Sequence, residues 1–389
     1  MRILYLTADP GIPVFGGKGA SVHVRALTAA FAGLGHEVMV ASPRIEPGEE
    51  RLPASVRCAQ IPAVRPRDVA SEADVVDAQA AQAEAVSRLA RELRADCIYE
   101  RYSLSSCAGA RSARALEIPL LVEVNAPLRE EERRFRQLAH ERAARSAEAE
   151  TFASATMIVA VSRWLRDWLI SQGVDPQRLE VIPNPPPAEL FADRGAPAEH
   201  APLCAGFCGS LKPWHGVETL VEAFRKATDA GARMELEIVG DGPAAAVVDA
   251  AIGASDRIRR LGQIPHREVV ACLERWDIGV APYSLMDGFY FSPLKLSEYM
   301  AAGVCPVVSA VGPLPGLVDG GRAGVIVPAD DPEALAGALL GLDRDRARLR
   351  RLAAEAQSIA RAQPSWTQVA ERLAAVLAGA TVAGSAVAR

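Results

Sequence analysis

The chain has 389 residues, which is too long for one hydrophobic core, so two domains of ordinary size are expected. Hydrophobic residues make up 50% of it and the formal net charge at pH 7 is −5, which gives no general basis for binding nucleic acid or an anionic surface. The seven cysteines are scattered without CxxC or CxxxH spacing, as expected of reduced thiols in a cytoplasmic protein. No apolar run reaches membrane-spanning length, and the chain starts with a predicted strand rather than a signal peptide.

Strand-like apolar segments alternate with amphipathic helical segments along nearly the whole chain. Such Val-, Ile- and Leu-rich runs, each followed by a helix, indicate parallel sheets that are covered on both faces. The predicted strands of the first half are residues 2–7, 36–42, 97–101, 120–125, 157–162 and 179–183. Those of the second half are residues 203–209, 234–240, 258–263, 278–283, 305–310 and 324–328.

A proline-rich stretch between residues 183 and 202 separates the two halves. We therefore predict an α/β fold with two Rossmann-like domains, residues 1–190 and 200–360, and a ligand between them beyond the carboxyl ends of the strands. Capping-box spacing at Ser365 and Gln368 predicts a last helix over about residues 365–378. The Ala-, Gly- and Val-rich residues 379–389 are expected to be disordered.

The first predicted strand runs into a glycine-containing loop, residues 9–19, that opens a helix. Glycines let a backbone approach a ligand closely. The loop is not a P-loop, because Gly17 stands at the Lys position and Lys18 has no Ser or Thr after it, and it lacks the GxGxxG dinucleotide spacing. Packing of the helix against its strand is the alternative explanation for these glycines.

The segment that says most about function is a predicted helix that begins near Ser292 and ends at Gly303. Ser followed by Pro is typical of an N-cap and first helical residue, which leaves the backbone N–H groups of Leu294 and Lys295 without intrahelical partners. These donors, the positive end of the helix dipole and the Lys295 ammonium predict a diphosphate site. Glu298 follows about one turn later and can accept hydrogen bonds from a ribose diol, so the segment predicts a nucleotide-sugar site.

Lysine is rare in this Arg-rich chain, and three of its four lysines lie in loops predicted to face a ligand. Lys18 is in the glycine loop, Lys212 follows the first strand of the second half, and Lys295 opens the helix described above, whereas Lys226 lies elsewhere. A compact ammonium suits a phosphate, which favours a role for these lysines there. Chance placement is the alternative with so few residues.

Seven short motifs occur in order along nearly the whole chain and resemble those of family 4 of the retaining GT-B glycosyltransferases. They are GGKGASVHV (residues 16–24), GHEV (35–38), VIPN (181–184), GSLKPWHG (209–216), VGDGP (239–243), LGQIPH (261–266) and SPLKLSEYMAAG (292–303). The resemblance implies a GT-B fold and transfer of a sugar from a nucleotide-diphosphate-sugar donor to an acceptor hydroxyl with retention of anomeric configuration.

The same resemblance implies which substrate each domain binds. The C-terminal domain would hold the donor, the N-terminal domain would hold a sugar, lipid-linked or small-molecule acceptor, and the last helix would cross back onto the first domain. No metal, cofactor or nucleic acid is expected, and contact with a membrane is at most peripheral.

Carried over residue by residue, the resemblance assigns most of the donor site to the second domain. Glu298 matches the second Glu of the family's E-x7-E motif and would bind ribose hydroxyls, while the backbone amides of Leu294 and Lys295 would bind the diphosphate. Gln263 and Ile264 would meet the base through their backbone. The full predicted donor set is Gly17, Ser210, Lys212, Gln263, Ile264, Tyr290, Ser292, Leu294, Lys295 and Glu298, and the predicted acceptor or sugar contacts are Lys18, His23 and Asn125.

Two departures from the family pattern concern the donor. The first Glu of E-x7-E falls on Tyr290, which leaves the donor sugar open. The usual Arg and Lys of the phosphate loop fall on Ser210 and His215, and an ordinary histidine is mostly neutral at pH 7. Lys212 and Lys295 are therefore expected to supply the positive charge.

The third departure is Asn125, which replaces the His that often ends the fourth strand and so removes a sugar-contacting donor. The implied mechanism needs no protein nucleophile, and Lys212 and Lys295 are the predicted catalytic residues because they would stabilise the leaving diphosphate. Two alternatives stay open: a nucleotide-sugar 2-epimerase of the same fold, which would need clustered acid and base carboxylates, and a sugar-nucleotide-binding protein without turnover.

Two helical stretches also have more than one explanation. Residues 163–169 place Trp164, Leu165, Trp168 and Leu169 on one helical face, which favours core packing over membrane contact. Residues 129–137 alternate in charge at helical spacing, which is typical of a solvated face, and acceptor binding is the alternative.

Overall fold

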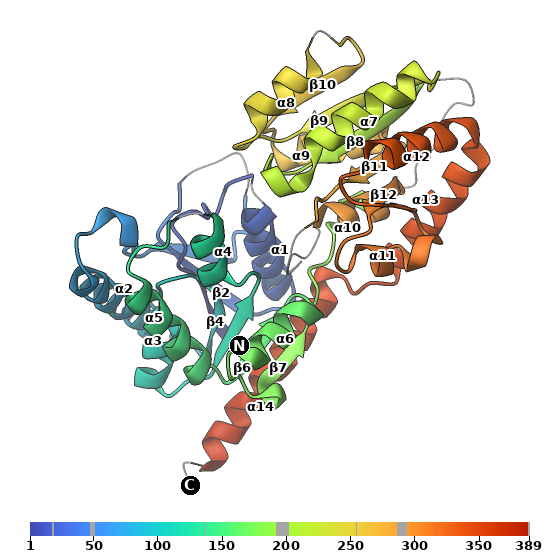
Figure 1. Cartoon of the computed structure of the whole chain (residues 1–389). Coiled ribbons are helices and arrows are strands. Elements are labelled where there is room, and N and C mark those ends of the chain that lie inside the picture. The colour runs from blue at the N-terminus through green and yellow to red at the C-terminus, as the bar shows by residue number, and fades with distance from the viewer. Residues whose placement is uncertain are drawn as a thin grey trace. The chain divides into compact units, whose positions relative to one another are not determined.

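The computed structural model describes residues 1–17, 19–46, 51–135, 137–191, 202–253, 255–285 and 294–387, with side chains to residue 379. This part of the chain forms two compact units (Figure 1). The first comprises Met1–Asn184 and the segment that begins at Ser365, and the second comprises the described residues from Pro185 to Pro364. The division between them falls inside the proline-rich stretch of the sequence.

A parallel sheet is the centre of the first unit. Its described strands are β1 (Arg2–Thr7), β2 (Glu37–Ser42), β3 (Val56–Gln60), β4 (Cys97–Arg101), β5 (Leu120–Val124), β6 (Met157–Ala160) and β7 (Leu179–Val181). Their order is β3-β2-β1-β4-β5-β6-β7, so β1 is central. The helices are α1 (Gly19–Gly33), η1 (Pro66–Asp68), α2 (Glu72–Leu93), α3 (Ala108–Leu116), α4 (Leu128–Phe135), α5 (Glu141–Ser154), α6 (Arg163–Ser171), η2 (Pro176–Arg178) and α14 (Trp366–Val387).

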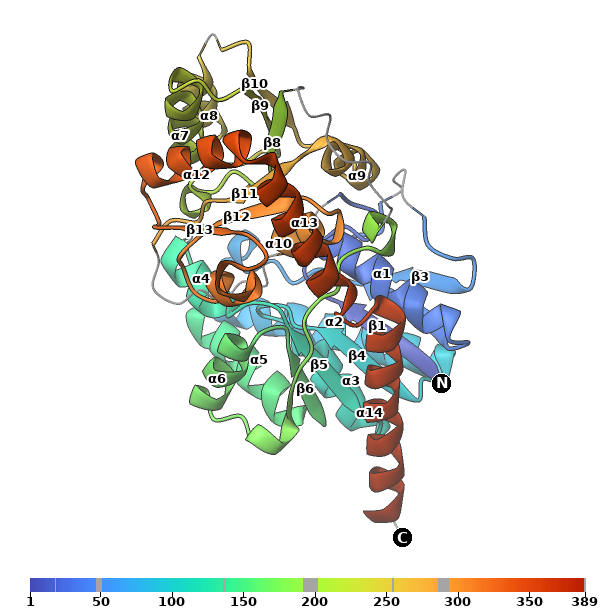
Figure 2. The same ribbon diagram turned by 90° about the vertical axis from the view of Figure 1, so that its right-hand side faces the viewer.

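Alternate residues of β1 face opposite helical layers, because successive side chains of a strand point to opposite faces of its sheet. Ile3 and Tyr5 pack with α1 and α14, whereas Leu4 and Leu6 pack with α2 and α3. Although it is last in the sequence, α14 lies along α1 (Figure 2), and its Leu373 belongs to the same buried cluster as Ile3. The C-terminal segment therefore completes the core of the first unit.

The second unit also contains a parallel sheet. Its described strands are β8 (Leu203–Cys208), β9 (Met234–Val239), β10 (Ile258–Gly262), β11 (Ile278–Ala281), β12 (Cys305–Ser309) and β13 (Val325–Val327), in the order β10-β9-β8-β11-β12-β13. Of the helices, α7 and α12 pack side by side (Figure 1). The helices are η3 (Ala188–Phe191), η4 (Pro213–His215), α7 (Val217–Asp229), α8 (Ala245–Ile252), α9 (His266–Arg275), α10 (Leu294–Ala301), α11 (Leu314–Leu317), η5 (Asp319–Gly321), α12 (Pro332–Arg344) and α13 (Arg346–Arg361).

Every predicted strand is present, and the α/β class with two Rossmann-like sheets is confirmed. Several strands end slightly earlier than predicted, and after β6, β7 and β11 apolar residues continue into the following loop. The prediction omits β3, an edge strand that contains Arg57 and Gln60 and buries only part of its length. Without an apolar run, such a strand carries little signal in the sequence.

The prediction for the C-terminus is wrong in its extent. Helix α14 continues to Val387, so it does not end near residue 378, and residues 379–387 are helical rather than disordered. This stretch is rich in alanine and has no proline, which favours continuation of a helix. The predicted capping box is confirmed, because Ser365 N–H donates to Gln368 Oε1 at 2.8 Å and Gln368 N–H donates to Ser365 Oγ at 3.2 Å.

Helix α6 packs as predicted for three of its four large apolar residues. Leu165, Trp168 and Leu169 are buried, whereas Trp164 is 36% exposed. No helix in the described ranges is both long and apolar enough to cross a membrane. All seven cysteines are free thiols in the structure.

Candidate functional site

Both sheets have the doubly wound strand order in which connections from the central strand run in opposite directions. Ligands of such folds bind beyond the carboxyl ends of the strands at this switch point. The switch point lies between β8 and β11 in the second unit and between β1 and β4 in the first. The segments that follow these strands are therefore the places where function is expected.

Lys295, the second residue of α10, reaches the switch point of the second sheet. Its Nζ lies 4.0 Å from the centroid of the Phe207 ring of β8 and 4.9 Å from that of Tyr283, which follows β11. Lys295 is 8% exposed, and among the described residues Nζ has no hydrogen-bond partner. Gly209 keeps the space beside it open, because a Cβ there would lie 2.9 Å from Nζ. A buried amine between ring faces is suited to receive an anion.

The charge of Lys295 depends on its surroundings. Burial lowers the pKa of Lys295 to about 7, although the nearby Cys208 and Glu298 act in the opposite direction. Near neutral pH the side chain is therefore divided between ammonium and neutral amine. An anion bound at Nζ favours the ammonium form by direct attraction.

His215 does not contribute positive charge. Burial, together with the charges of Lys295 and Lys212, lowers the pKa of His215 to about 2, although a hydrogen bond to the Ser210 carbonyl acts in the opposite direction. The expectation of a neutral His215 is confirmed. Because the carbonyl oxygen accepts from Nδ1–H, the other ring nitrogen, Nε2, carries a lone pair and can accept a hydrogen bond.

Lys212 lies in the loop between β8 and α7. Its Nζ is 4.8 Å from the centroid of the Trp214 ring. Its backbone N–H donates to the Ser210 carbonyl at 3.0 Å, and its own carbonyl accepts from the His215 N–H at 2.9 Å. The loop thus gathers Ser210, Lys212 and His215 at the carboxyl end of β8.

Glu298 lies one turn into α10, beside the first residue of α9. Its Oε1 is 3.6 Å from His266 Nε2, and the two side chains are 16% and 15% exposed. Gln263 and Ile264 connect β10 to α9 and immediately precede Pro265 and His266. The structure therefore brings the predicted ribose carboxylate next to the end of the predicted base loop.

The other predicted donor residues divide into two groups. Leu294 is the first residue of α10, where its backbone N–H has no intrahelical acceptor, and Gly17 is exposed in the loop before α1. Tyr290 and Ser292 lie outside the described residues, as does Lys18, a predicted acceptor or sugar contact.

In the first unit, His23 and Asn125 belong to a buried network around Glu123 of β5. One carboxylate oxygen, Oε2, lies 3.2 Å from His23 Nε2, and the other, Oε1, accepts from Arg101 Nη1 at 3.1 Å. Asn125 and Tyr99 donate to the same carboxylate. Burial by itself would raise the pKa of Glu123, but the charges of His23 and Arg101 and the hydrogen bonds lower it to about 2. The network keeps Glu123 ionised inside the fold.

This network also reaches the C-terminal helix. The His23 ring meets Trp366 edge-on, with 5.0 Å between ring centroids, and Asn125 Oδ1 accepts from Asn184 Nδ2 at 3.3 Å. His23 is only 3% exposed. These two of the three predicted sugar contacts, His23 and Asn125, therefore make structural contacts, and their direct contact with a substrate stays a prediction.

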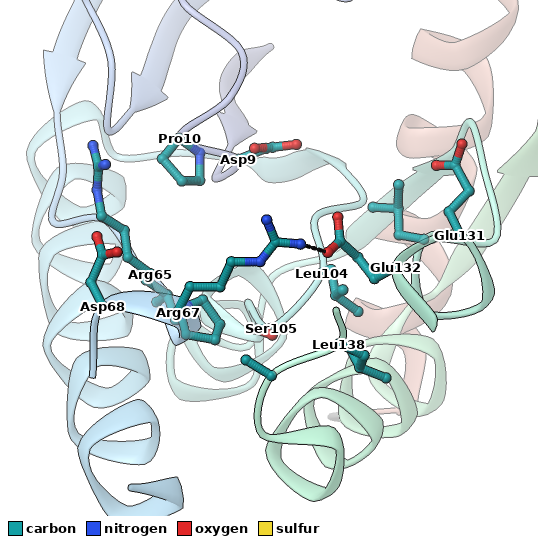
Figure 3. A pocket seen from close by; sticks show the side chains of 14 residues that line it. Asp9, Pro10, Arg65, Arg67, Asp68, Leu104, Ser105, Glu131, Glu132 and Leu138 are labelled. Atoms are coloured by element: carbon teal, nitrogen blue, oxygen red, sulfur yellow. Dashed lines mark hydrogen bonds and ion pairs between the residues drawn. The ribbon is translucent and has the colours of Figure 1, made fainter. Parts of the chain in front are cut away.

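A pocket of about 300 Å³ opens at the switch point of the first sheet (Figure 3). The segments that line it follow β1, β3, β4 and β5 and include part of the charge-alternating stretch of the sequence. None of the predicted acceptor contacts within the described residues is among its lining residues. These are Asp9, Pro10, Val64, Arg65, Pro66, Arg67, Asp68, Leu104, Ser105, Leu128, Glu131, Glu132, Leu138 and Ala139.

Sequence reasoning missed Phe207, Tyr283 and His266 as site residues. The available signal was the position of each at or just beyond the end of a strand, or at the start of the helix after it. In the part of the chain that the structure describes, no three His, Cys, Asp or Glu side chains are grouped as metal ligands would be.

Two family models match the chain in succession. Glycosyltransferase Family 4 matches residues 17–189, and Glycosyl transferases group 1 matches residues 203–345. The chain belongs to the group 1 glycosyltransferases. This membership confirms the resemblance inferred from the seven motifs.

Individual proteins agree with this membership. The amylovoran biosynthesis glycosyltransferase AmsK of Erwinia amylovora is 28% identical over 201 residues, which are 50% of this chain and 49% of AmsK, so the chain spans about half the length of this relative. Sucrose-phosphate synthase from Thermosynechococcus elongatus is 20% identical with a TM-score of 0.74, over 98% of this chain and 100% of that one. Anabaena HepE in complex with UDP-glucose is 18% identical with a TM-score of 0.73, over 97% and 100%. These structures establish the GT-B fold of this family member.

Proposed function

We propose that the chain moves a sugar from a nucleotide-diphosphate-sugar donor to an acceptor hydroxyl, with retention of anomeric configuration and without a metal or cofactor. The observation that carries the proposal is the surroundings of Lys295. A buried amine at a switch point would meet the diphosphate, Glu298 one turn further on would meet the ribose, and the loop before His266 would meet the base. Diphosphate, ribose and base are joined in this order in a nucleotide donor.

Family membership and the solved neighbours support the same donor class. HepE, whose fold this chain shares, was solved with UDP-glucose bound. In the second unit, helix α10 begins at Leu294, and the N-terminus of a helix favours a phosphate.

In the proposed reaction, the bond between the anomeric carbon and the diphosphate oxygen breaks, and the acceptor oxygen bonds to that carbon on the same face. The acceptor proton passes to the leaving diphosphate, so the protein needs no nucleophile. Negative charge develops on the diphosphate oxygens, where Lys295, Lys212 and the Leu294 N–H would stabilise it. The lone pair on His215 Nε2 suits a hydroxyl better than a phosphate.

A thermal-shift screen tests the donor half of the proposal. We expect one of UDP, GDP and ADP to raise the melting temperature, because a ligand that binds only the native state stabilises it. The corresponding sugar nucleotide should then be hydrolysed slowly when no acceptor is present. No shift with any of the three would contradict the proposed donor class, and binding without turnover would indicate a sugar-nucleotide-binding protein.

Chelation tests the proposed independence from metals. Turnover of the donor identified in the screen should be unchanged in excess EDTA. Complete loss of turnover that Mg²⁺ or Mn²⁺ restores would contradict the metal-free mechanism.

A further inference from the structure

The ring of His215 presents a hydrogen-bond acceptor close to Lys295. We propose that His215 Nε2 accepts a hydrogen bond from one hydroxyl of the transferred sugar, and that it thereby selects the donor sugar at that ring position. This inference rests on the proposed transferase function and adds to it a residue that determines donor specificity.

Two loops of the second unit hold the His215 ring in place. His215 belongs to η4, in the loop after β8, yet its ring lies edge-on against Tyr283, which follows the neighbouring strand β11, with 5.2 Å between ring centroids. The two loops are joined by a hydrogen bond of 3.1 Å from the Ser284 N–H to the Trp214 carbonyl. Lys295 Nζ lies 4.9 Å from the centroid of the same Tyr283 ring. The imidazole and the amine are therefore close neighbours in the candidate donor site.

The contact made by Nδ1 determines what Nε2 can do. The Ser210 carbonyl oxygen can only accept a hydrogen bond, so Nδ1 carries the proton of the ring. Burial keeps the ring neutral, since it lowers the pKa of His215 to about 2, and Nε2 therefore carries a lone pair. Within the described part of the chain, no group donates to this lone pair. A hydroxyl of a ligand can donate to it, whereas an ionised phosphate has no proton to give.

The order of the strands indicates which hydroxyl meets His215. Across the second sheet, β10, β9, β8 and β11 are successive neighbours. The predicted base loop follows β10, and Glu298, the predicted ribose carboxylate, lies beside His266 at the end of that loop. Lys295, the predicted diphosphate contact, reaches Tyr283 at the end of β11. A donor laid out in this direction places its sugar toward β11, where His215 meets Tyr283, and its ribose beside Glu298.

Deoxy sugars measure the proposed contact. The probe is the most tightly bound of UDP-, GDP- and ADP-linked glucose, galactose and mannose, together with its 2-, 3-, 4- and 6-deoxy analogues, and calorimetric titration gives each dissociation constant. A site that accepts a hydroxyl rejects the analogue that lacks it, because the lone pair is left unsatisfied. We expect one analogue to bind about three- to tenfold more weakly than the parent because of His215, the usual cost of losing a hydrogen bond between neutral groups. Equal binding of all the analogues and the parent would overturn the inference.

Two substitutions separate the roles of the two ring nitrogens. His215→Asn keeps a donor for the Ser210 carbonyl, because the Asn amide nitrogen can take the place of Nδ1, but it removes the acceptor at Nε2. His215→Gln reaches further and puts an amide oxygen where Nε2 lies. We expect His215→Asn to bind the parent and the sensitive analogue equally, and His215→Gln to retain part of the difference. An unchanged difference in His215→Asn would overturn the inference, because the hydroxyl would then be recognised by another group.

The nucleoside diphosphate alone shows which part of the donor His215 contacts. Because it has no sugar, we expect its affinity to be unchanged in His215→Asn, which also shows that the variant is folded. An equal loss of affinity for the diphosphate and for the sugar nucleotide would overturn the inference. His36→Asn is the matched control, because His36 belongs to the first unit, where its Nδ1 lies 3.1 Å from the amino group of Met1. It should retain the wild-type difference between parent and analogue.

The same measurements separate this inference from the proposed function. If a sugar nucleotide binds but the deoxy penalty does not depend on His215, the inference fails alone. If the expected preference is found without turnover of the donor, the proposed transfer fails alone. If no nucleoside diphosphate binds, both fail.

Discussion

The two sheets share one pattern of strand order, yet the side chains at their switch points differ. In the second sheet, buried Lys295 lies against the rings of Phe207 and Tyr283 and offers a cation to an anionic ligand. In the first, the described lining of an open pocket includes four carboxylates and two guanidinium groups. The comparison teaches that strand order determines where a ligand can bind, whereas the side chains after the strands determine the charge of that ligand.

Each unit also buries a titratable side chain that has no hydrogen-bond partner among the described residues. Glu100 of β4 is fully buried, and burial raises its pKa to about 8, just as burial lowers the pKa of Lys295 to about 7. Glu100 faces α3, because a Cβ on Gly109 would lie 2.0 Å from its Oε2, and it does not line the pocket. The same physical cause therefore acts on a core residue in one unit and on a site residue in the other.

The largest expected effect on activity comes from removing the buried ammonium group of Lys295. We expect Lys295→Met to lower kcat about 10²–10³-fold, with a smaller rise in donor KM, because the interaction strengthens as charge develops on the leaving group. Lys212→Met should act in the same direction but less, because this partly exposed ammonium is screened by solvent. Lys226→Met is the control, since Lys226 pairs with Glu333 at 2.6 Å on the surface. Wild-type kcat with only a raised KM would show that Lys295 binds ground-state donor alone.

The next effect concerns stability of the first unit. Because the folded-state pKa of Glu100, about 8, exceeds its usual value of 4.5, the free energy of unfolding falls as pH rises between these values. The loss at pH 7 is about 3 kcal/mol. Glu100→Gln cannot ionise, so we expect this decline to disappear in denaturant titrations from pH 5 to pH 8. Glu84→Gln, on the exposed face of α2, should keep the decline, and a wild-type slope in Glu100→Gln would refute the account.

A third prediction concerns the ribose contact. Glu298→Ala should weaken binding of the nucleoside diphosphate about tenfold or more, the usual cost of losing hydrogen bonds to a charged group. The fold should stay intact, because the carboxylate lies 3.6 Å from His266 Nε2 and both side chains are partly exposed. Calorimetric titration measures the affinity and thermal unfolding checks the fold. The same affinity in both proteins would exclude Glu298 as the ribose ligand.

The smallest effect is a pH dependence of donor binding. With the pKa of Lys295 at about 7, its ammonium fraction falls as pH rises, so UDP-glucose, if that is the donor, should bind about fivefold more weakly at pH 8 than at pH 7. Cys208 and His215 do not titrate in this range, because burial raises the pKa of Cys208 to about 12 and lowers that of His215 to about 2.

The proton that Lys295 takes up when the donor binds should be detectable by calorimetry. Binding heats measured in buffers of different ionisation enthalpy should reveal proton uptake by the wild type and none by Lys295→Met. Equal affinity at the two pH values without uptake would mean that Lys295 stays charged in the free protein.

Local patterns predicted the helix that carries two residues of the second unit's candidate site. The turn from Ser292 into a helix and the one-turn spacing to Glu298 are short-range signals, and α10 carries Lys295 and Glu298 as expected. The partners of these residues could not be predicted in the same way. Phe207 and Tyr283 come from separate strand segments, and only the packing of the sheet places their rings beside Lys295 Nζ.

The sequence by itself determined the α/β class, the central strands, the capping of α14 and the family, because apolar periodicity, caps and motifs act over a few residues. Tertiary structure decided the charge states of Lys295, His215 and Glu123, because a pKa depends on burial and on neighbours distant in the sequence. It also decided that segments after four different strands enclose one pocket in the first unit. Desolvation and convergence of distant loops are properties of the folded chain, so no local pattern contains them.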